Sequence, residues 1–175
     1  MELLFKRVEV PAKVLDLGCG DGALAYLLYK KGYTTTGIDT NQLGIDLAIK
    51  QHGKRKTSCE FYCMHSKDLQ DSSFDAVICS DVIEHVDDAS QLINDIYRLL
   101  KTGGTAIIST PIRITEQPLD QEHIVEWFPL EFEKLFTGFE AKFYISHPVA
   151  LMEMMNQTWL RIIINLISMV TNPFY

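Results

Sequence analysis

The residues with the clearest chemical potential lie in a glycine-rich segment, VLDLGCGDG at positions 14–22. Glycine has no Cβ and accepts positive φ angles, so the backbone can turn sharply and a ligand can lie against its N–H groups. The apolar run before the glycines predicts a strand, and ALAYLL after them predicts a helix whose first turn favours anionic groups. Gly18, Gly20 and Ala23 fit the dinucleotide spacing G-x-G-x-x-A. The segment therefore predicts a loop that binds a nucleotide-type cofactor.

Two aspartates narrow the choice of cofactor. Asp39 follows the run TTTGI, where a carboxylate can accept hydrogen bonds from both hydroxyls of a ribose; the alternative is that it only caps the next helix. Asp16 stands just before Gly18, where its charge would repel a pyrophosphate but attract a ligand with a positive amino group. S-adenosylmethionine has such a group and a sulfonium, so Asp16 favours it over a nicotinamide dinucleotide.

Strands and helices alternate along the chain, which is typical of a mostly parallel sheet with helices on both faces. We expect strands over 13–17, 34–38, 59–64, 76–79, 105–109 and 141–146, and helices over 23–31, 41–51 and 129–136. A further helix is expected to begin after the N-cap Asp88, with Gln91 at N3, and to end at Gly103 and Gly104. Its apolar stripe consists of Leu92, Ile93, Ile96, Tyr97 and Leu100.

The end of the chain has apolar residues at helical spacing opposite polar ones. We expect a long amphipathic helix over 149–175 that packs on the domain formed by 1–148 or on a partner subunit. Contact with a lipid surface is the alternative. Arg161 and Asn165 interrupt the apolar face, so a membrane span is not expected.

Composition bounds the function further. The 175 residues are 47% hydrophobic and 22% charged, which predicts one globular domain, and the net charge of −7 argues against a nucleic-acid surface. The basic cluster at 50–56, which includes His52, is expected to be a solvated loop. The cysteines form no C-x-x-C pair and follow no secretory signal, so we expect a reducing, cytoplasmic setting. A zinc site at Cys59, Cys63 and His65 is disfavoured, because cysteine on one strand face is usually buried packing.

Four segments resemble, in order, the motifs of class I S-adenosylmethionine-dependent methyltransferases: VLDLGCGDG, GIDTNQLGIDLA, SSFDAVICSDVIEHV and LKTGGTAIISTP. The most similar group is that of the ubiquinone and menaquinone methylases, and the resemblance spans about residues 13–139. It implies a Rossmann-like three-layer α/β/α sandwich with strand order 3-2-1-4-5-7-6. It also implies S-adenosylmethionine as methyl donor and S-adenosylhomocysteine as product. The implied donor contacts are Asp16, Gly18, Cys19 and Gly20 around the methionine part, Asp39 at the ribose, Thr40 and Leu43 beside the adenosine, His65, Ser66, Asp68 and Leu69 in the adenine-side loop, and Ser80, Asp81 and Val82 near the methyl group.

The chain departs from the family pattern at three places. His65 stands where members often carry an aspartate, although Asp68 lies close by. Members usually have helices before the first strand that cover the site, but only about a dozen residues precede it here, so a homodimer is one alternative source of cover. The antiparallel seventh strand has no counterpart in the sequence, and we expect the sheet to lack it.

Some methyl acceptors must lose a proton during the reaction, and a base among the residues after the fourth expected strand could take it. His85 is the first candidate for this base, and His123, near Glu126, is the second. The alternative for His85 is that it only caps or packs a short helix. Asp81, Glu84 and His85 share one face of a helical turn, so another alternative is that they hold a divalent cation that acidifies a catechol-like hydroxyl. Their spacing is similar to E-x-x-E-H in quinone-precursor O-methyltransferases.

The expected function is methyl transfer from S-adenosylmethionine to a small molecule. The segment CSDV at 79–82 lacks the N/D-P-P-Y type of motif of enzymes that methylate bases or glutamine, and with the acidic net charge this favours a small-molecule acceptor. Oxygen is modestly favoured over nitrogen or carbon as the acceptor atom. Two alternatives remain open: an inactive S-adenosylmethionine-binding regulatory or partner subunit, and a nicotinamide-dependent oxidoreductase.

Overall fold

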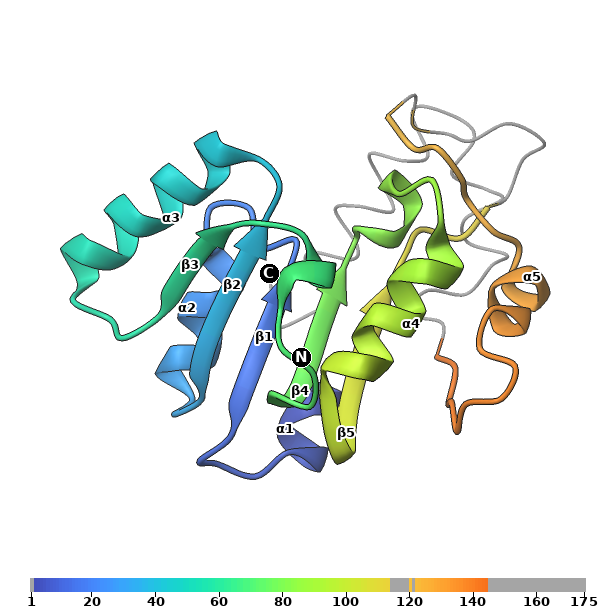
Figure 1. The fold of residues 1–175 in the computed structure, drawn as a ribbon, viewed down its shortest axis with the longest axis horizontal. Coiled ribbons are helices and arrows are strands. Elements are labelled where there is room, and N and C mark those ends of the chain that lie inside the picture. Colours follow the sequence, from blue (N-terminus) through green and yellow to red (C-terminus); the bar gives the residue numbers. More distant parts are fainter. Residues whose placement is uncertain (1, 114–119, 121, 145–175) are drawn as a thin grey trace, which may run out of the picture.

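A five-stranded parallel sheet forms the centre of the molecule. The computed structural model describes residues 2–113, 120 and 122–144. Its strand order is β3-β2-β1-β4-β5, which confirms the expected Rossmann-like order over these strands (Figure 1). The strands are β1 Lys13–Leu17, β2 Thr34–Asp39, β3 Glu60–Cys63, β4 Phe74–Ser80 and β5 Leu100–Ser109.

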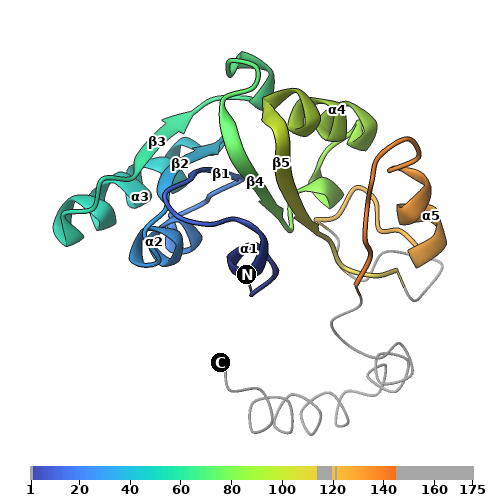
Figure 2. The same ribbon diagram turned by 90° about the horizontal axis from the view of Figure 1, so that it is seen from below.

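Helices lie on both faces of this sheet. They are α1 Glu2–Arg7, α2 Ala23–Lys30, α3 Gln42–Arg55, α4 Ala89–Leu99 and α5 Pro129–Lys134, with short 3₁₀ helices at Ser66–Asp68 and Ile83–His85. Figure 2 shows α1, α2 and α3 on one face and α4 on the other, so the three-layer arrangement is confirmed. The helix α1 precedes the first strand, where none was expected. None of the helices in the described part of the chain has both the length and the apolarity to cross a bilayer.

Successive side chains of β1 and β4 point to opposite faces of the sheet, so the apolar core has two parts. Val14 and Ile78 face α1 and α2, whereas Leu15 and Val77 face the cluster around α4. Because successive side chains of a strand point to opposite faces, both faces of β1 and β4 must be apolar. The side chain of Asp16 shares the face of Val14 by this alternation, and its burial is therefore unusual for a charged group.

Caps define where the helices begin. Asn41 caps α3, because its side chain accepts hydrogen bonds from the amides of Leu43 and Gly44 at 3.0 and 3.5 Å. Asp88 caps α4 and accepts the amide of Gln91 at 2.8 Å, as the sequence predicts. The helix α2 ends at Lys30. Its C-cap is Lys31, and Gly32 follows with a φ of 93°.

The predicted end of α4 is wrong. The helix ends at Leu99, and Leu100 is already extended and pairs with Phe74 of β4. Gly103 and Gly104 therefore lie inside β5, because pairing with β4 overrides the local signal for a helix end. Tyr97 is also not part of the buried stripe: its side chain is exposed and contacts Phe139, with ring centroids 5.4 Å apart.

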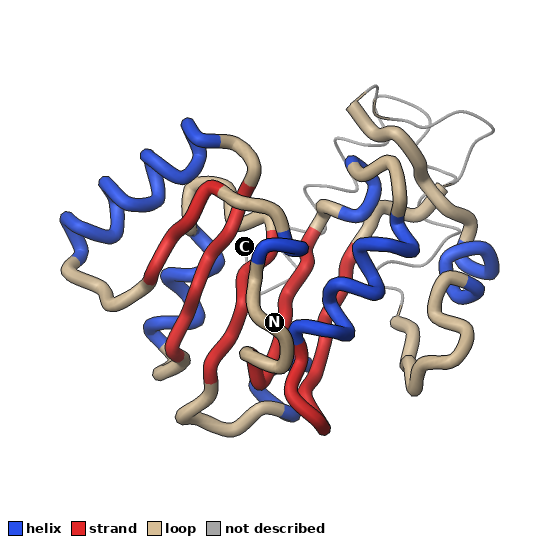
Figure 3. The backbone as a smooth tube through the Cα atoms, viewed as in Figure 1, coloured by secondary structure: helices blue, strands red, loops and turns tan. Residues whose placement is uncertain are grey.

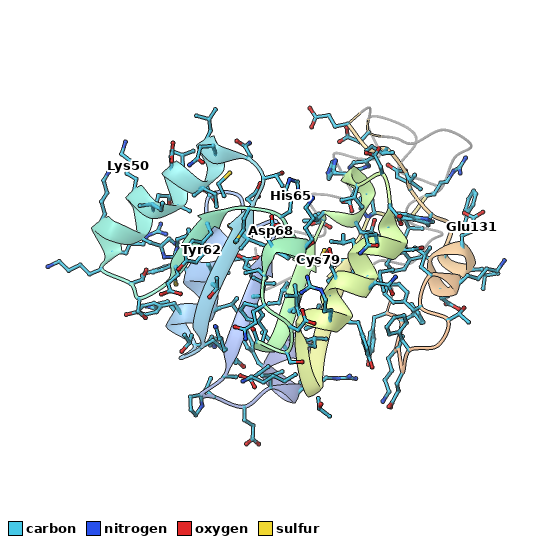
Figure 4. The ribbon with its side chains drawn as sticks, in the orientation of Figure 1. Lys50, Tyr62, His65, Asp68, Cys79 and Glu131 are labelled. Carbon is cyan, nitrogen blue, oxygen red and sulfur yellow. The ribbon has the colours of Figure 1, made fainter. Side chains whose placement is uncertain are left out.

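Two further expectations fail. The basic cluster at 50–56 is not a loop but the last part of α3, and His52 within it is buried. Its other basic side chains are exposed, as Lys50 is in Figure 4. The described part of the expected sixth strand, residues 141–144, is not a strand, since no neighbouring strand pairs with it. The expected helix over 149–175 lies outside the described residues, and so does the boundary between the two expected domains.

Candidate functional site

The candidate site lies where the carboxyl ends of β1, β2, β4 and β5 meet (Figure 3). In open parallel sheets ligands bind at this edge, near the point where the strand order reverses. Here the order reverses between β1 and β4. The glycine loop follows β1 and the segment Ser80–His85 follows β4, so the fold brings the two predicted parts of the site together.

The glycine loop, residues 18–22, is held to the end of β2. The amides of Gly18 and Cys19 donate to the carbonyl of Ile38 at 2.8 and 3.0 Å, and the amide of Gly20 donates to Oδ2 of Asp39 at 2.9 Å. Oδ1 of Asp39 accepts the amide of Asn41 at 2.8 Å. Asn41 is the helix cap, so Asp39 does not only cap α3, and its carboxylate instead fastens the glycine loop. The ribose contact of Asp39 stays a prediction.

Gly18 is required by packing as well as by conformation. Its φ is 78°, and a Cβ there would lie 2.2 Å from Cγ2 of Val82. The absence of a side chain therefore lets the turn after β4 pack directly on the glycine loop. Val82 therefore lies beside the glycine loop, and its contact with the donor stays a prediction.

Asp16 lies in β1, two residues before the glycine loop, and its acidic side chain is buried. Its side chain is 2% exposed, and its Oδ2 has no hydrogen-bond partner in the described part of the chain. Burial, with a further contribution from the charge of Asp39, raises the pKa of Asp16 to about 7. A buried carboxylate oxygen that lacks a partner costs free energy until a cation or a donor reaches it. Burial also raises the pKa of the Cys19 thiol to about 12, so this thiol is neutral and is not a nucleophile.

The predicted adenine-side residues lie on the connection between β3 and β4, where Figure 4 shows His65 and Asp68. Two residues of α4 hold this connection. The Ser66 hydroxyl donates to Asp95 at 2.7 Å, and the Arg98 guanidinium donates to the carbonyls of Ser66 and Leu69 at 3.0 and 2.8 Å. Sequence reasoning did not find Asp95 and Arg98 in this role. Their place on the helix surface facing the connection becomes evident only in the fold.

Thr40 and Leu43 lie at the start of α3, next to the loop. Both are exposed, and Leu43 is 74% exposed, which leaves its side chain accessible to a ligand. The structure thus leaves the predicted adenosine contacts as an expectation.

The turn after β4 carries a polar cluster. Asp81 has a φ of 54°, which is rare for a residue with a side chain. Its Oδ1 accepts the Ser109 hydroxyl at 3.1 Å, and the hydroxyls of Ser80 and Ser109 lie 2.9 Å apart. The amide of Asp81 also donates to the carbonyl of Ser109 at 3.1 Å. The carboxylate of Asp81 is therefore engaged with the end of β5.

Glu84, His85 and His123 form the second half of the site. One ligand atom of each lies within 4.8 Å of those of the other two, and the two imidazole centroids are 4.9 Å apart. His123, rather than the predicted Asp81, thus joins Glu84 and His85. The segment 122–126 reaches them because the amides of Ile124 and Val125 donate to the carbonyl of Glu84 at 2.9 and 3.2 Å.

Hydrogen bonds orient both imidazoles. Nδ1 of His85 lies 3.1 Å from the carbonyl of Glu122, and Nδ1 of His123 lies 2.7 Å from Oε1 of Glu126, which is buried. Because both partners are acceptors, each ring carries a hydrogen on Nδ1. Nε2 of His123 lies 4.0 Å from Oδ2 of Asp120. The bond to Glu126 raises the pKa of His123. The sequence indicated Glu126 only as a neighbour of His123.

Glu84 is the other buried acid of the site. Neither of its carboxylate oxygens, nor the nearby Thr110 hydroxyl, has a partner with hydrogen-bond geometry among the described residues. Burial raises the pKa of Glu84. The buried oxygens of Glu84 and the two imidazoles are a set of ligand groups that suits a divalent cation, because metal-binding histidines usually donate one ring N–H to a carbonyl or a carboxylate.

Comparison with known proteins agrees with this geometry. A family model described as a methyltransferase domain matches residues 15–108, more than half of the chain. A ubiquinone biosynthesis O-methyltransferase of Rickettsia bellii is 33% identical over 122 residues, 67% of this chain and 51% of that protein. Its counterpart in Pseudomonas savastanoi is 35% identical over 101 residues, 56% of this chain and 44% of that protein. The chain thus spans about half the length of these curated relatives.

Solved structures share the fold. The YcgJ protein of Bacillus subtilis has a TM-score of 0.68 at 21% identity, over 78% of this chain and 65% of that chain. The PH0226 protein of Pyrococcus horikoshii has a TM-score of 0.60 at 30% identity, over 63% and 51% of the two chains. Together with the match over residues 15–108, the glycine loop and the acidic residues around it assign this chain to the methyltransferase-domain family.

Proposed function

We propose that this protein transfers a methyl group from S-adenosylmethionine to an oxygen of a small molecule. The observation that carries the proposal is the buried carboxylate of Asp16 below the glycine loop, which has an oxygen without a partner among the described residues. An ammonium group of the donor would supply that partner. Asp39, at the end of the next strand, has the chemistry to accept the ribose hydroxyls. The relatives named as O-methyltransferases support an oxygen acceptor.

The reaction needs little covalent help from the protein. The acceptor hydroxyl loses its proton, its oxygen attacks the methyl carbon, and the carbon–sulfur bond breaks to release neutral S-adenosylhomocysteine. In-line positioning supplies much of the rate, because the sulfonium is already an activated leaving group. His85 and His123 lie together beyond the end of β4, and either imidazole in its neutral form can accept the proton of the acceptor hydroxyl.

A divalent cation at Glu84, His85 and His123 is a second element of the proposal. The buried oxygens of Glu84, unpartnered within the described part of the chain, and the orientation of both imidazoles fit such a group. When bound, the cation would make an acceptor hydroxyl more acidic. Glu126 would hold the ring of His123 in position through its bond to Nδ1. Titration of the metal-free protein with Mn²⁺ or Zn²⁺, compared with Glu84→Gln and His123→Ala, tests this element directly.

Isothermal titration calorimetry with S-adenosylhomocysteine and with NAD tests the donor assignment. We expect binding of the first and not of the second. Binding of NAD alone would support the oxidoreductase alternative. Binding of S-adenosylhomocysteine without turnover of any catechol-like or other hydroxyl acceptor, with and without divalent cations, would support the inactive regulatory or partner subunit.

The proposed cellular compartment, dimer and lipid contact of the protein are each independent of its chemistry. We propose a reducing, cytoplasmic setting from the sequence pattern of the cysteines, which are Cys19, Cys59, Cys63 and Cys79. The proposed cover of the site by a second copy predicts a dimer in light-scattering measurements. The proposed contact of residues 149–175 with lipid predicts co-sedimentation with anionic vesicles, and loss of that binding when these residues are removed.

A further inference from the structure

His52 connects α3 to the glycine loop. Its side chain is 3% exposed, and both ring nitrogens have partners. Nε2 lies 3.0 Å from the carbonyl of Gly22, and Nδ1 lies 2.7 Å from the hydroxyl of Thr57. A carbonyl can only accept, so Nε2 carries the hydrogen and Nδ1 accepts from Thr57. The carbonyl of Gly22 thus fixes the form of His52, and the hydroxyl of Thr57, which can donate or accept, complements that form.

Two aromatic rings and Gly22 pack closely around the imidazole of His52. The imidazole contacts the ring of Phe61 on β3, with centroids 4.6 Å apart, and the ring of Tyr26 on α2, with centroids 6.0 Å apart. A Cβ on Gly22 would lie 3.0 Å from Nε2 of His52 and 3.0 Å from the ring of Phe61. The close approach of these rings, together with a φ of 78°, accounts for glycine at position 22.

The glycine loop is therefore held at both ends. At its start, Gly18 and Cys19 donate to the carbonyl of Ile38. At its end, the amide of Gly22 donates to Cys19 at 2.9 Å, while the carbonyl of Gly22 accepts from His52 and from the amide of Tyr26. His52 lies below the loop with Phe61, on the side of α3.

We infer that His52 is a positioning residue for the methyl donor: it holds the carbonyl of Gly22 and thereby fixes the loop in the form that binds the donor. This inference rests on the proposed function, because the ligand of the loop is S-adenosylmethionine there. His52 itself does not touch the donor. A loop held in its binding form loses less conformational freedom when the ligand binds, so the effect belongs to donor affinity and not to the chemical step.

Two substitutions separate the hydrogen bond to Gly22 from packing. In His52→Gln the amide nitrogen can lie as many bonds from Cβ as the imidazole Nε2, so the bond to Gly22 can be kept. In His52→Asn the amide reaches only as far as Nδ1, so the contact with Thr57 can be kept and the bond to Gly22 is lost. We expect His52→Asn to weaken binding of S-adenosylhomocysteine about three- to tenfold, which corresponds to one hydrogen bond, and His52→Gln to restore most of it. The kcat at saturating donor is expected to stay within about twofold.

The variant Ile96→Val is the control for effects that come from lower stability alone. Ile96 is buried in α4 on the opposite face of the sheet, and its shortening lowers stability without touching the loop. We expect unchanged affinity for S-adenosylhomocysteine in this control. Equal weakening by Asn and Gln, or the same weakening in Ile96→Val, would overturn the inference.

Hydrogen exchange keeps the test independent of the ligand. The amides of Gly18, Cys19, Gly20 and Gly22 are expected to exchange faster in His52→Asn than in His52→Gln, both without ligand. If wild-type protein does not bind S-adenosylhomocysteine, the proposed function falls, and the exchange rates alone decide the role of His52. Equal exchange in the two variants would overturn that role.

Discussion

Gly20 and Asp39 are joined by a 2.9 Å hydrogen bond from the loop amide to the carboxylate that ends β2. The other carboxylate oxygen accepts the amide of Asn41 at 2.8 Å. Each carboxylate oxygen has two lone pairs, so Asp39 can hold the loop and the start of α3 and still accept hydrogen bonds from a ligand. A single acidic side chain thus supports the loop and the start of α3, and it keeps lone pairs for the donor contact that we propose.

Substitution of Asp39 is expected to weaken donor binding strongly. Asp39→Ala removes the bond to Gly20 and the proposed contacts with the ribose, so we expect at least about tenfold weaker binding of S-adenosylhomocysteine in calorimetry. Asp46→Ala is the matched control, because Asp46 lies on α3 and its carboxylate accepts a hydrogen bond from the exposed Gln42 side chain at 2.8 Å, away from the loop. Equal affinity in both variants would contradict the role of Asp39.

Donor binding is expected to release a proton from Asp16. Its pKa is about 7 without ligand, well above the ordinary 3.8, so the carboxyl is partly protonated at neutral pH. A bound ammonium group lowers this pKa, so affinity is expected to rise as pH increases from about 6 to 7.5. Calorimetry in buffers of different ionisation enthalpy measures the released proton. Asp16→Asn is expected to bind more weakly and to lose this release.

The same shift predicts a pH-dependent cost in stability. Between 3.8 and about 7 the folded protein binds more protons at Asp16 than the unfolded chain does, so this group lowers the unfolding free energy as pH rises through that window. The unfolding free energy of unliganded Asp16→Asn minus that of wild type should therefore be larger at about pH 8 than at about pH 4, by on the order of 1 kcal/mol or more. Urea unfolding at both pH values measures the difference, and a constant difference would refute it.

Alanine at Gly18 is expected to disrupt the site. The substitution places a side chain at a φ of 78° and within 2.2 Å of Val82, so we expect a loss of about 1–3 kcal/mol in unfolding free energy and of donor binding. Gly53→Ala is the control within α3, because its Cβ would meet open space. That variant is expected to be about 0.4–1 kcal/mol more stable, and urea unfolding of both variants tests the contrast.

Removal of the acceptor-side groups should lower turnover without weakening donor binding. We expect His85→Ala and His123→Ala to lower kcat by roughly 10²- to 10⁴-fold on a hydroxyl acceptor if one histidine is the base, with one variant affected far more than the other. Comparable losses in both variants and in Glu84→Gln would instead favour the shared cation, provided that chelation abolishes wild-type turnover and added metal restores it. Asp87→Asn is the control, because Asp87 is only two residues from His85 in the chain but lies outside the cluster. Unchanged turnover in all three variants would exclude the cluster from catalysis.

Local signals in the sequence predicted the strands and helices around the glycine loop. The strand and helix bounds around the glycine loop agree with the structure within about a residue, because apolar runs, glycines and caps are properties of neighbouring residues. The end of α4 could not be read in this way, since pairing of Leu100 with Phe74 decides it. The burial of His52 was missed for a similar reason: its place in a basic run indicated solvent, whereas packing against Phe61 and Tyr26 encloses the ring.

The expectation of an S-adenosylmethionine-type donor follows from a few residues of known spacing, Asp16, Gly18, Gly20 and Asp39, and needs no coordinates. The partners of those residues follow only from the fold. Contact between His123 and His85, the bond from His52 to Gly22 and the approach of Val82 to Gly18 all join residues far apart in the chain. Their physical origin is the packing of parallel strands whose carboxyl ends meet at one edge, an arrangement that brings distant loops together and that no local pattern contains.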